Sequence, residues 1–370
     1  MKLALDLTHC SHSSAQTGIQ QVARGLAASL PGQIDVTHIV YDKYGDYWRP
    51  VDKREESHLA TIDSVEKVKR KRPHWSSWQR VRGRFQKRLG IRRQGNLENC
   101  DAALIPEFFA EWVGPRLPEL KQLVNGPLVA VFHDCIAFHR PEWGVPATVE
   151  RYPQYLRELA GLDGIACVSE FSRKELLLAL EKVGATPPRQ IRVIPLGLRT
   201  DHLGESDSTG IIQTGRPPTI LCVATIEPRK NHTALLVAAE SLWDRGFDFK
   251  LILVGMVNRG SGRPIESEIK RLQAQNRTIK WRGSLSAGDL AALYRTVDAT
   301  IFPSVCEGFG LPVRESLYFG KPCLSANGGA LREVAPGGGT LVANPDAEGM
   351  TAIMEKYLSS NECRQRLQHE

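Results

Sequence analysis

The chain has 370 residues, of which 48 are Lys or Arg and 41 are Asp or Glu, giving a formal net charge of +7. This length exceeds what one ordinary hydrophobic core accommodates, so we expect two domains. The longest apolar runs fall short of the ~20 residues of a membrane-spanning helix, and the strand-like start has no signal-peptide core, which favours a cytoplasmic protein. Eight cysteines with neither Cys-x-x-Cys nor zinc-ligand spacing predict reduced thiols.

The start of the chain predicts a strand at Lys2–Leu7 and an amphipathic helix at Gly18–Leu30, because the apolar residues of the second segment recur with helical period. Thr17-Gly18 either caps this helix or lets the backbone approach a phosphate. His9 and His12 lie in the polar loop before the helix, but no third ligand with suitable spacing accompanies them. We therefore expect no metal there.

The excess of basic residues belongs to one segment. From Lys67 to Leu97 there are twelve Lys and Arg and no Asp or Glu. Apolar residues recur there at helical spacing, opposite basic ones, as is typical of a helix lying on anionic lipid. A solvated insertion is the alternative, and nucleic acid is not expected because no recognition motif is present. We predict contact with an anionic membrane surface through residues 67–93, around Trp78, Val81, Phe85 and Leu89.

Further strands, alternating with helical patterns, indicate α/β architecture in this half of the chain. His133 and Asp134 follow one of these strands, at the end where open α/β sheets bind ligands, although a lone His there can also complete a hydrogen-bond network. Ser172 with Glu175 fits a capping box at a helix start. The strands are expected at Ile34–Val40, Asp101–Pro106, Leu128–Phe132, Gly164–Val168 and Ile191–Pro195.

A second series of strands and helices begins at Thr219–Ala224, after a stretch rich in Gly, Ser, Thr and Pro. Arg229 and Lys230 follow the new strand as adjacent cations, which suits them to neutralise a diphosphate. A surface charge pair is the ordinary alternative. Later strands are expected at Lys250–Gly255, Thr278–Arg282, Ala299–Phe302 and Lys321–Ser325.

The strand at Ala299–Phe302 leads into a loop with two glycines, followed by a helix that Pro312 opens. Unpaired backbone amides and the helix dipole favour an anion at such a helix start. Glu307 and Glu315 lie on either side of the glycines, and carboxylates accept hydrogen bonds from hydroxyl groups. The arrangement suits a sugar nucleotide, whereas a capped surface loop is the simpler alternative.

The run Glu307–Glu315 resembles the paired-glutamate motif of the retaining GT-B glycosyltransferases of family 4. Glu227–Asn231 is similar to the diphosphate-binding element of that family, and Val131–Glu142 to the element whose histidine faces the donor sugar. Thr278–Ser286 resembles its turn under the nucleotide base. The chain differs from many members in having Ala224-Thr225 where Gly-Arg is common.

The resemblance implies an α/β GT-B fold, with two facing Rossmann-like domains of mostly parallel sheets. The expected domains are residues 1–198, with a basic insertion at 66–97, and residues 219–370, joined by a linker at 199–218. The residues implied to be catalytic are His133, Arg229, Lys230 and Glu307. Those implied to bind the donor are Gly18, Asp134, Arg282, Gly308, Phe309, Gly310, Leu311 and Glu315.

The resemblance also implies a metal-independent, retaining hexosyltransferase without a cofactor. Its donor would be a nucleotide-diphosphate sugar, with GDP-mannose favoured, and its acceptor a glycan or lipid-linked glycan of surface polysaccharide synthesis at the inner membrane face. Two alternatives remain open: a sugar-nucleotide epimerase of the same fold, and a non-catalytic protein that binds an anionic polymer.

Overall fold

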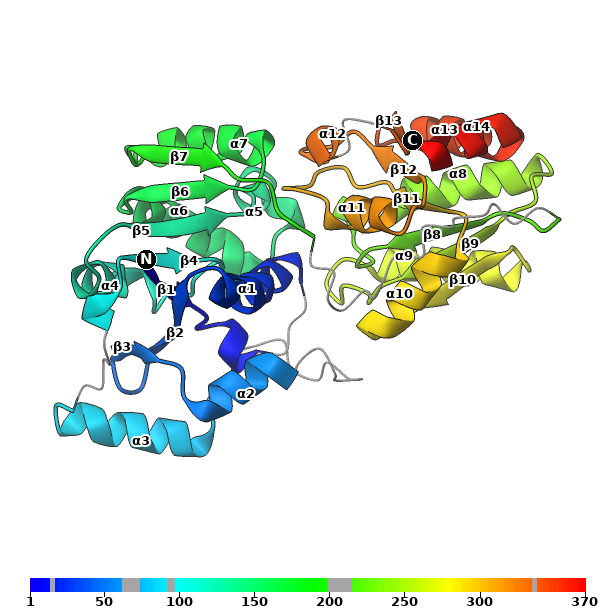
Figure 1. The fold of residues 1–370 in the computed structure, drawn as a ribbon. Coiled ribbons are helices and arrows are strands. Elements are labelled where there is room, and N and C mark those ends of the chain that lie inside the picture. Colours follow the sequence, from blue (N-terminus) through cyan, green and yellow to red (C-terminus); the bar gives the residue numbers. More distant parts are fainter. Residues whose placement is uncertain (14–16, 62–73, 92–96, 199–214, 335–337) are drawn as a thin grey trace. The chain divides into compact units, whose positions relative to one another are not determined.

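The computed structural model describes residues 1–13, 17–61, 74–91, 97–198, 215–334 and 338–370. These residues form two compact units, Met1–Leu196 and Gly197–Glu370 (Figure 1). Most of the predicted linker, and residues 67–73 and 92–93 of the predicted membrane-contact segment, lie outside the described residues. Among the described helices, none is both long and apolar enough to cross a bilayer.

The amino-terminal unit contains a seven-stranded sheet of order β3-β2-β1-β4-β5-β6-β7. All neighbouring strands pair in parallel except β2 and β3, which form an antiparallel hairpin. The strands are β1 (Lys2–Asp6), β2 (Asp35–Asp42), β3 (Tyr47–Pro50), β4 (Ala102–Ile105), β5 (Leu128–Phe132), β6 (Gly164–Cys167) and β7 (Gln190–Val193).

Helices cover both faces of this sheet, which explains why its central strands are continuous apolar runs. Leu128, Ala130 and Phe132 of β5 pack in one cluster with Leu156 and Leu159. The helices are α1 (Gly18–Ser29), α2 (Lys53–Thr61), α3 (Ser77–Arg88), α4 (Leu117–Leu123), α5 (Ile136–His139), α6 (Pro146–Ala160) and α7 (Glu170–Lys182).

The carboxyl-terminal unit contains a six-stranded sheet of order β10-β9-β8-β11-β12-β13, parallel throughout. The strands are β8 (Thr219–Val223), β9 (Lys250–Val254), β10 (Ile279–Arg282), β11 (Ala299–Phe302), β12 (Cys323–Ala326) and β13 (Thr340–Ala343). The helices are α8 (His232–Asp244), α9 (Arg263–Ala274), α10 (Ala287–Thr296), α11 (Leu311–Tyr318), α12 (Leu331–Val334), α13 (Ala347–Ser359) and α14 (Asn361–His369). The expected α/β class with mostly parallel sheets is therefore confirmed.

Both sheets reverse their strand order beside their first strand. In the amino-terminal unit β1 pairs with β2 and with β4, and in the carboxyl-terminal unit β8 pairs with β9 and with β11. Loops that leave the carboxyl ends of two such neighbouring strands diverge to opposite faces of the sheet and leave a crevice between them, where open α/β sheets bind ligands. The fold therefore predicts a ligand-binding site at the loops after β8 and β11 in the carboxyl-terminal unit.

The capping box predicted from Ser172 and Glu175 is wrong. Helix α7 begins at Glu170, and the side chain of Ser169 caps it by accepting a hydrogen bond of 3.0 Å from the Ser172 amide. The Ser172 hydroxyl instead donates to the carbonyl oxygen of His133, at 2.7 Å. The helix starts one turn earlier than expected because Ser169 already has the extended backbone of an N-cap.

The cysteines are free thiols, as their spacing predicted. Cys167, Cys222 and Cys323 lie in strands with their side chains buried. Burial raises the pKa of each of these thiols to about 12, so they pack as small apolar groups.

Candidate functional site

The loop after β8 is fastened to the loop after β11. Pro228–Lys230 form a short 3-10 helix that ends at Asn231, whose backbone is left-handed with φ of 55°. The Asn231 side-chain amide donates to the carbonyl oxygens of Pro303, at 3.2 Å, and Pro345, at 2.8 Å. A backbone hydrogen bond of 3.0 Å from Val305 to Arg229 adds a further tie. The Arg229-Lys230 pair is therefore held against the loop that carries Glu307.

Glu307 lies between the two cations. Lys230 Nζ is 2.6 Å from Glu307 Oε1, and Arg229 Nη1 is 3.0 Å from Glu307 Oε2. Arg229 also donates to the carbonyl oxygen of Cys306, at 2.9 Å, and forms an ion pair of 3.2 Å with Glu227. The Glu307 side chain is only 10% exposed, so these pairs are screened weakly by water.

The charge state of Glu307 follows from this arrangement. Burial alone would raise the pKa of its carboxyl group, but the nearby charges of Lys230 and Arg229 outweigh burial and lower the pKa to about 2. Glu307 is therefore a carboxylate at neutral pH. It can accept hydrogen bonds but has no proton to donate.

The glycines predicted to approach an anion do shape a tight loop. Gly310 precedes α11 as its N-cap, with φ of 115°, and a Cβ there would lie 2.7 Å from Leu331 Cδ2. A Cβ at Gly329 would lie 2.4 Å from the Glu307 carbonyl oxygen, and the Ala330 amide donates to that same oxygen at 2.9 Å. The turn before α12 thus clamps the backbone at Glu307.

The loop ends at the start of α11, whose first residue is Leu311 and whose first turn presents amides that no helical carbonyl can pair. Gly308, Phe309 and Gly310 lie just before it, with the Phe309 side chain buried. Glu315 lies one turn into α11 and accepts a hydrogen bond of 2.9 Å from the Tyr294 hydroxyl. The anion-favouring helix start and both motif carboxylates therefore belong to one strand-loop-helix unit.

Within the carboxyl-terminal unit, the predicted donor-binding residue Arg282 lies away from this cluster. It ends the outer strand β10, which β9 separates from β8, and it is exposed. Its carbonyl oxygen accepts a hydrogen bond of 3.1 Å from the Gly255 amide. Arg282 shares the carboxyl edge of the sheet with the cluster, but it does not lie at the reversal of strand order between β8 and β11.

His133 lies in the amino-terminal unit, after β5. Its Nε2 is 2.7 Å from the carbonyl oxygen of Pro106, and because a carbonyl only accepts, the ring proton is on Nε2 and Nδ1 is an acceptor. Burial lowers the pKa of His133, so the ring is neutral at pH 7. Asp134 accepts a hydrogen bond of 3.0 Å from the Ile136 amide, which gives it a local structural role.

Gly18 begins α1 and is exposed, with Thr17 as the N-cap residue. The Thr17 hydroxyl bonds to the Gln20 side chain rather than to a backbone amide. Gly18 therefore stays accessible at a helix start that the Thr17 side chain does not cap.

The sequence interpretation missed a buried carboxylate, Glu107. It follows β4, and it accepts hydrogen bonds from the amide of Cys10 at 3.1 Å and from its thiol at 3.2 Å. Nδ1 of His9 lies 3.4 Å away. Its position directly after the predicted strand Asp101–Pro106 could have marked it as a candidate, because ligand-binding residues follow the strands of such sheets. In the structure this strand, β4, lies at the reversal of strand order beside β1.

His12 has a structural role. It stacks on Trp75 with ring centroids 3.8 Å apart, and its Nε2 is 3.0 Å from Glu55 Oε1. In the part of the chain that the structure describes, no group of three His, Cys, Asp or Glu side chains could hold a metal ion.

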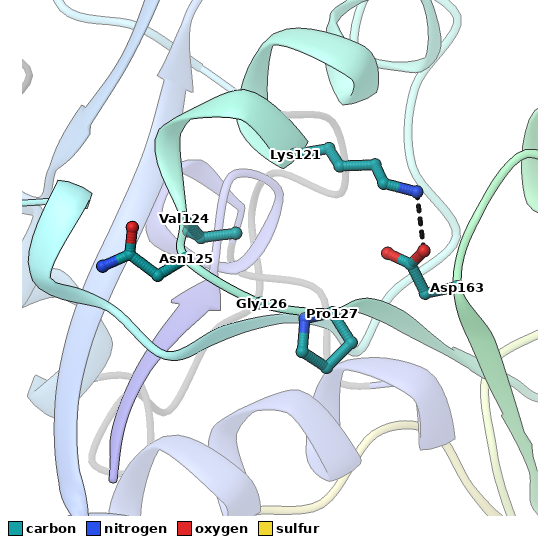
Figure 2. Close-up of a pocket in the computed structure, with 6 residues that line it drawn as sticks. All are labelled: Lys121, Val124, Asn125, Gly126, Pro127 and Asp163. Carbon is teal, nitrogen blue, oxygen red and sulfur yellow. Dashed lines mark hydrogen bonds and ion pairs between the residues drawn. The ribbon is translucent and has the colours of Figure 1, made fainter.

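A surface pocket lies at the opposite edge of the amino-terminal sheet (Figure 2). It is lined by residues just before β5 and β6, where Lys121 and Asp163 form an ion pair of 2.6 Å. Asp163 also accepts from the Leu128 amide at 2.9 Å, so this pair ties the strand ends together. The pocket lies at the amino ends of the strands and not where such sheets bind ligands.

Comparison with known proteins shows what this chain is similar to. The sequence profile of the glycosyl transferases group 1 matches residues 210–370. The serotype-specific mannosyltransferase WbdA of Escherichia coli is 25% identical over 359 residues, which is 90% of this chain and 40% of WbdA. The O-antigen chain mannosyltransferase B of Escherichia coli is 29% identical over 245 residues, covering 64% of this chain and 62% of the relative.

A GDP-mannose-dependent alpha-(1-6)-phosphatidylinositol dimannoside mannosyltransferase of Mycobacterium tuberculosis is 26% identical over 215 residues, covering 57% of this chain and 53% of the relative. The chain thus spans less than two thirds of the length of these relatives.

Solved structures share the fold. Anabaena Alr3699/HepE in complex with UDP superposes with a TM-score of 0.65 at 16% identity, covering 99% of this chain and 92% of that one. WaaG, a glycosyltransferase involved in lipopolysaccharide biosynthesis, superposes with a TM-score of 0.60 at 16% identity, over 99% and 93% of the two chains. Residues 210–370 therefore match the model of the glycosyl transferases group 1, and the chain shares the GT-B fold of these solved structures.

Proposed function

We propose that the chain is a retaining hexosyltransferase that moves mannose from a nucleotide-diphosphate sugar, with GDP-mannose favoured, to a glycan or lipid-linked acceptor of surface polysaccharide synthesis. The observation that carries the proposal is the Arg229–Glu307–Lys230 cluster, which lies at the reversal of strand order beside the start of α11.

The cluster suits the departure of a nucleoside diphosphate. As the bond between the anomeric carbon and the phosphate oxygen breaks, negative charge grows on the diphosphate. Arg229, Lys230 and the amides at the start of α11 are already in place to stabilise that charge. Because these groups supply the positive charge, the proposed reaction needs no metal ion.

Retention follows if acceptor and leaving group share one face of the sugar. The acceptor oxygen bonds to the anomeric carbon as the phosphate oxygen leaves, and the acceptor proton passes to that phosphate oxygen. Glu307 is already ionised, so we assign it hydrogen bonds from sugar hydroxyls and no proton transfer. His133 and Asp134 remain proposed ligands of the donor sugar.

The identity of the sugar rests on the relatives. The relatives named above are mannosyltransferases, and the mycobacterial protein is described as GDP-mannose-dependent. Mannose as the sugar and GDP as the nucleotide are therefore our proposals for this chain.

A panel of donors tests the function. The protein is incubated with GDP-mannose, GDP-fucose, UDP-glucose and UDP-N-acetylglucosamine, and both thermal protection and nucleotide release are measured. We expect GDP-mannose to protect most. Lys230→Ala should abolish protection, while Lys270→Ala, which removes an exposed ion pair on α9, should leave it unchanged.

Release of GDP that depends on an added mannoside, with an α-linked product, would support transfer. Interconversion of the donor without an acceptor would identify an epimerase instead, and protection without any turnover would identify a binding protein.

A further inference from the structure

Helix α3 presents its apolar side chains outward. Trp78 is 62% exposed, Val81 67%, Phe85 61% and Leu89 55%. These four residues share one side of the helix, which we call the α3 apolar face. Isolated exposed apolar residues are ordinary, but a continuous face of large side chains marks an interaction site.

The opposite side of the helix is polar and buried. Gln79 donates to Glu55 Oε1 at 2.8 Å, and Gln86 accepts from the Tyr47 hydroxyl at 3.2 Å. Gly83 lies between them, where a Cβ would meet Tyr44 Cβ at 2.7 Å and the Gly45 amide nitrogen at 2.8 Å. This is the reverse of an ordinary surface helix, which buries its apolar side.

Ion pairs and a cap hold α3 in this orientation. Arg82 lies 3.4 Å from Asp52, and Lys87 lies 2.9 Å from Asp46. Ser76 and Gln79 form a capping box at its start. Turning the apolar face inward would break these contacts and press a larger side chain against the backbone at Gly45. The outward orientation is therefore built into the packing of the amino-terminal unit.

The charges beside the apolar face indicate what covers it. Arg84 and Arg88 are exposed, and at helical spacing they lie along the edge of the face next to Val81. The chain from Lys67 to Leu97 contains no acidic residue. Two copies meeting through this face would bring like charges together, and nucleic acid would leave the apolar side chains in water. A surface with anionic head groups above an apolar layer satisfies both features.

We propose that the α3 apolar face docks into the interface of a bilayer containing anionic lipid, with Arg84 and Arg88 at the head groups. Trp78 and Phe85 enter the boundary between head groups and acyl chains, and Arg82, whose guanidinium lies 4.5 Å from the centre of the Trp78 ring, stays at its edge. The amino-terminal unit is thereby held at the membrane surface by a peripheral contact. The proposal does not depend on the identity of the donor.

Vesicle co-sedimentation of the full chain tests the proposal. We expect binding to vesicles of phosphatidylcholine with phosphatidylglycerol, weaker binding when salt is added, and little binding to phosphatidylcholine alone. The double variant Val81→Ser, Phe85→Ser should lose about tenfold or more in partition. Arg84→Gln with Arg88→Gln should lose about tenfold on the anionic vesicles.

Leu178→Ser is the matched control, because Leu178 is 50% exposed on α7 and distant in sequence. It should bind as the unaltered chain does, and all variants should keep the same melting temperature and the same protection by donor. The proposal is overturned if the unaltered chain binds neither kind of vesicle, or if the α3 variants bind anionic vesicles as well as the unaltered chain. A dimer in solution that the Val81→Ser, Phe85→Ser change dissociates would identify a second copy as the occupant.

Discussion

Lys230 and Glu307 are separated by 77 positions in the chain, yet Lys230 Nζ and Glu307 Oε1 lie 2.6 Å apart. They meet because β8 and β11 are parallel neighbours in the sheet, so that the residues following both strands lie at the same carboxyl edge. Arg229 completes the cluster from the same loop as Lys230. The pairing keeps two cations in place before any ligand binds.

Glu307→Gln separates the charge of this residue from its size. The amide keeps the shape, but Arg229 and Lys230 lose their carboxylate, so both become more available to phosphate. We expect GDP to bind several-fold more tightly while turnover falls about a hundredfold, because the sugar loses a charged hydrogen-bond acceptor. Calorimetric titration with GDP and steady-state rates measure the two effects. Glu266→Gln, at an exposed pair on α9, is the control and should change neither. Weaker GDP binding in Glu307→Gln would contradict the assigned role of the cluster.

The depressed pKa of Glu307 also predicts a pH dependence of stability. Its folded-state pKa of about 2 lies below the ordinary value of 4.5, so its ion pairs stabilise the fold fully above about pH 5 and are lost as the pH falls toward 2. The difference corresponds to about 3 kcal/mol in the free energy of unfolding. Glu55 titrates in the same range. Burial would raise the pKa of its carboxyl group, but Arg49 and His12 outweigh burial and lower the pKa to about 2.

Because Glu55 titrates in the same range, the effect of Glu307 is isolated by comparing the pH dependence of stability in the unaltered chain and in Glu307→Gln. Urea unfolding between pH 2 and 6 should give a shallower loss of stability in the variant. Parallel curves would show that Glu307 does not titrate as a buried ion pair.

Gly310→Ala should damage both the fold and the site. The left-handed backbone disfavours any side chain, and the added Cβ would also meet Leu331 Cδ2 at 2.7 Å. We expect a loss of about 1–3 kcal/mol in the free energy of unfolding, with weaker protection by donor. Gly246→Ala shares the positive φ but has no atom within 4 Å of the new Cβ, so it isolates the backbone effect. Gly288→Ala, inside α10 with open space, should be neutral or stabilising. If all three variants melted alike, the close packing against Leu331 would be unimportant.

Asn231 can be tested in two steps. Asn231→Gly keeps the left-handed backbone at φ of 55° but removes the side-chain bonds to Pro303 and Pro345, whereas Asn231→Ala removes the bonds and adds strain. We expect the glycine variant to lose about 1–2 kcal/mol in the free energy of unfolding and the alanine variant about 1 kcal/mol more. Both should raise the KM for the donor, because Arg229 and Lys230 are no longer held against the loop of Glu307. An unchanged KM in the two variants would show that this tie does not position the cations.

Much of the site could be predicted from the sequence because its parts are local. A strand, a glycine loop and a helix start are encoded within about twenty neighbouring residues, so Glu307, Gly310 and Glu315 could be placed on one unit before the structure was known. The Arg229-Lys230 pair after β8 was placed for the same reason. The hairpin strand β3 was not predicted, since four residues carry little periodic signal. Helix α2 was not predicted either, because its sequence is mostly polar and shows no clear apolar face.

Contacts between residues far apart in the sequence could not be predicted from the local spacing of apolar and polar residues. Periodicity marked the apolar and basic sides of α3, but only the buried partners Glu55, Tyr44 and Tyr47 decided that its polar side faces the protein. Ser172 fitted a cap, yet the helix began earlier and its hydroxyl reached the backbone of His133 instead.

The sequence by itself determined the alternation of strands and helices and the residue types at the strand ends, because propensity and period act over a few residues. The order of strands in each sheet brought Glu107 beside Cys10 and Glu307 beside Lys230. That order is decided only when the whole core packs, since burial of both sheet faces depends on every strand at once.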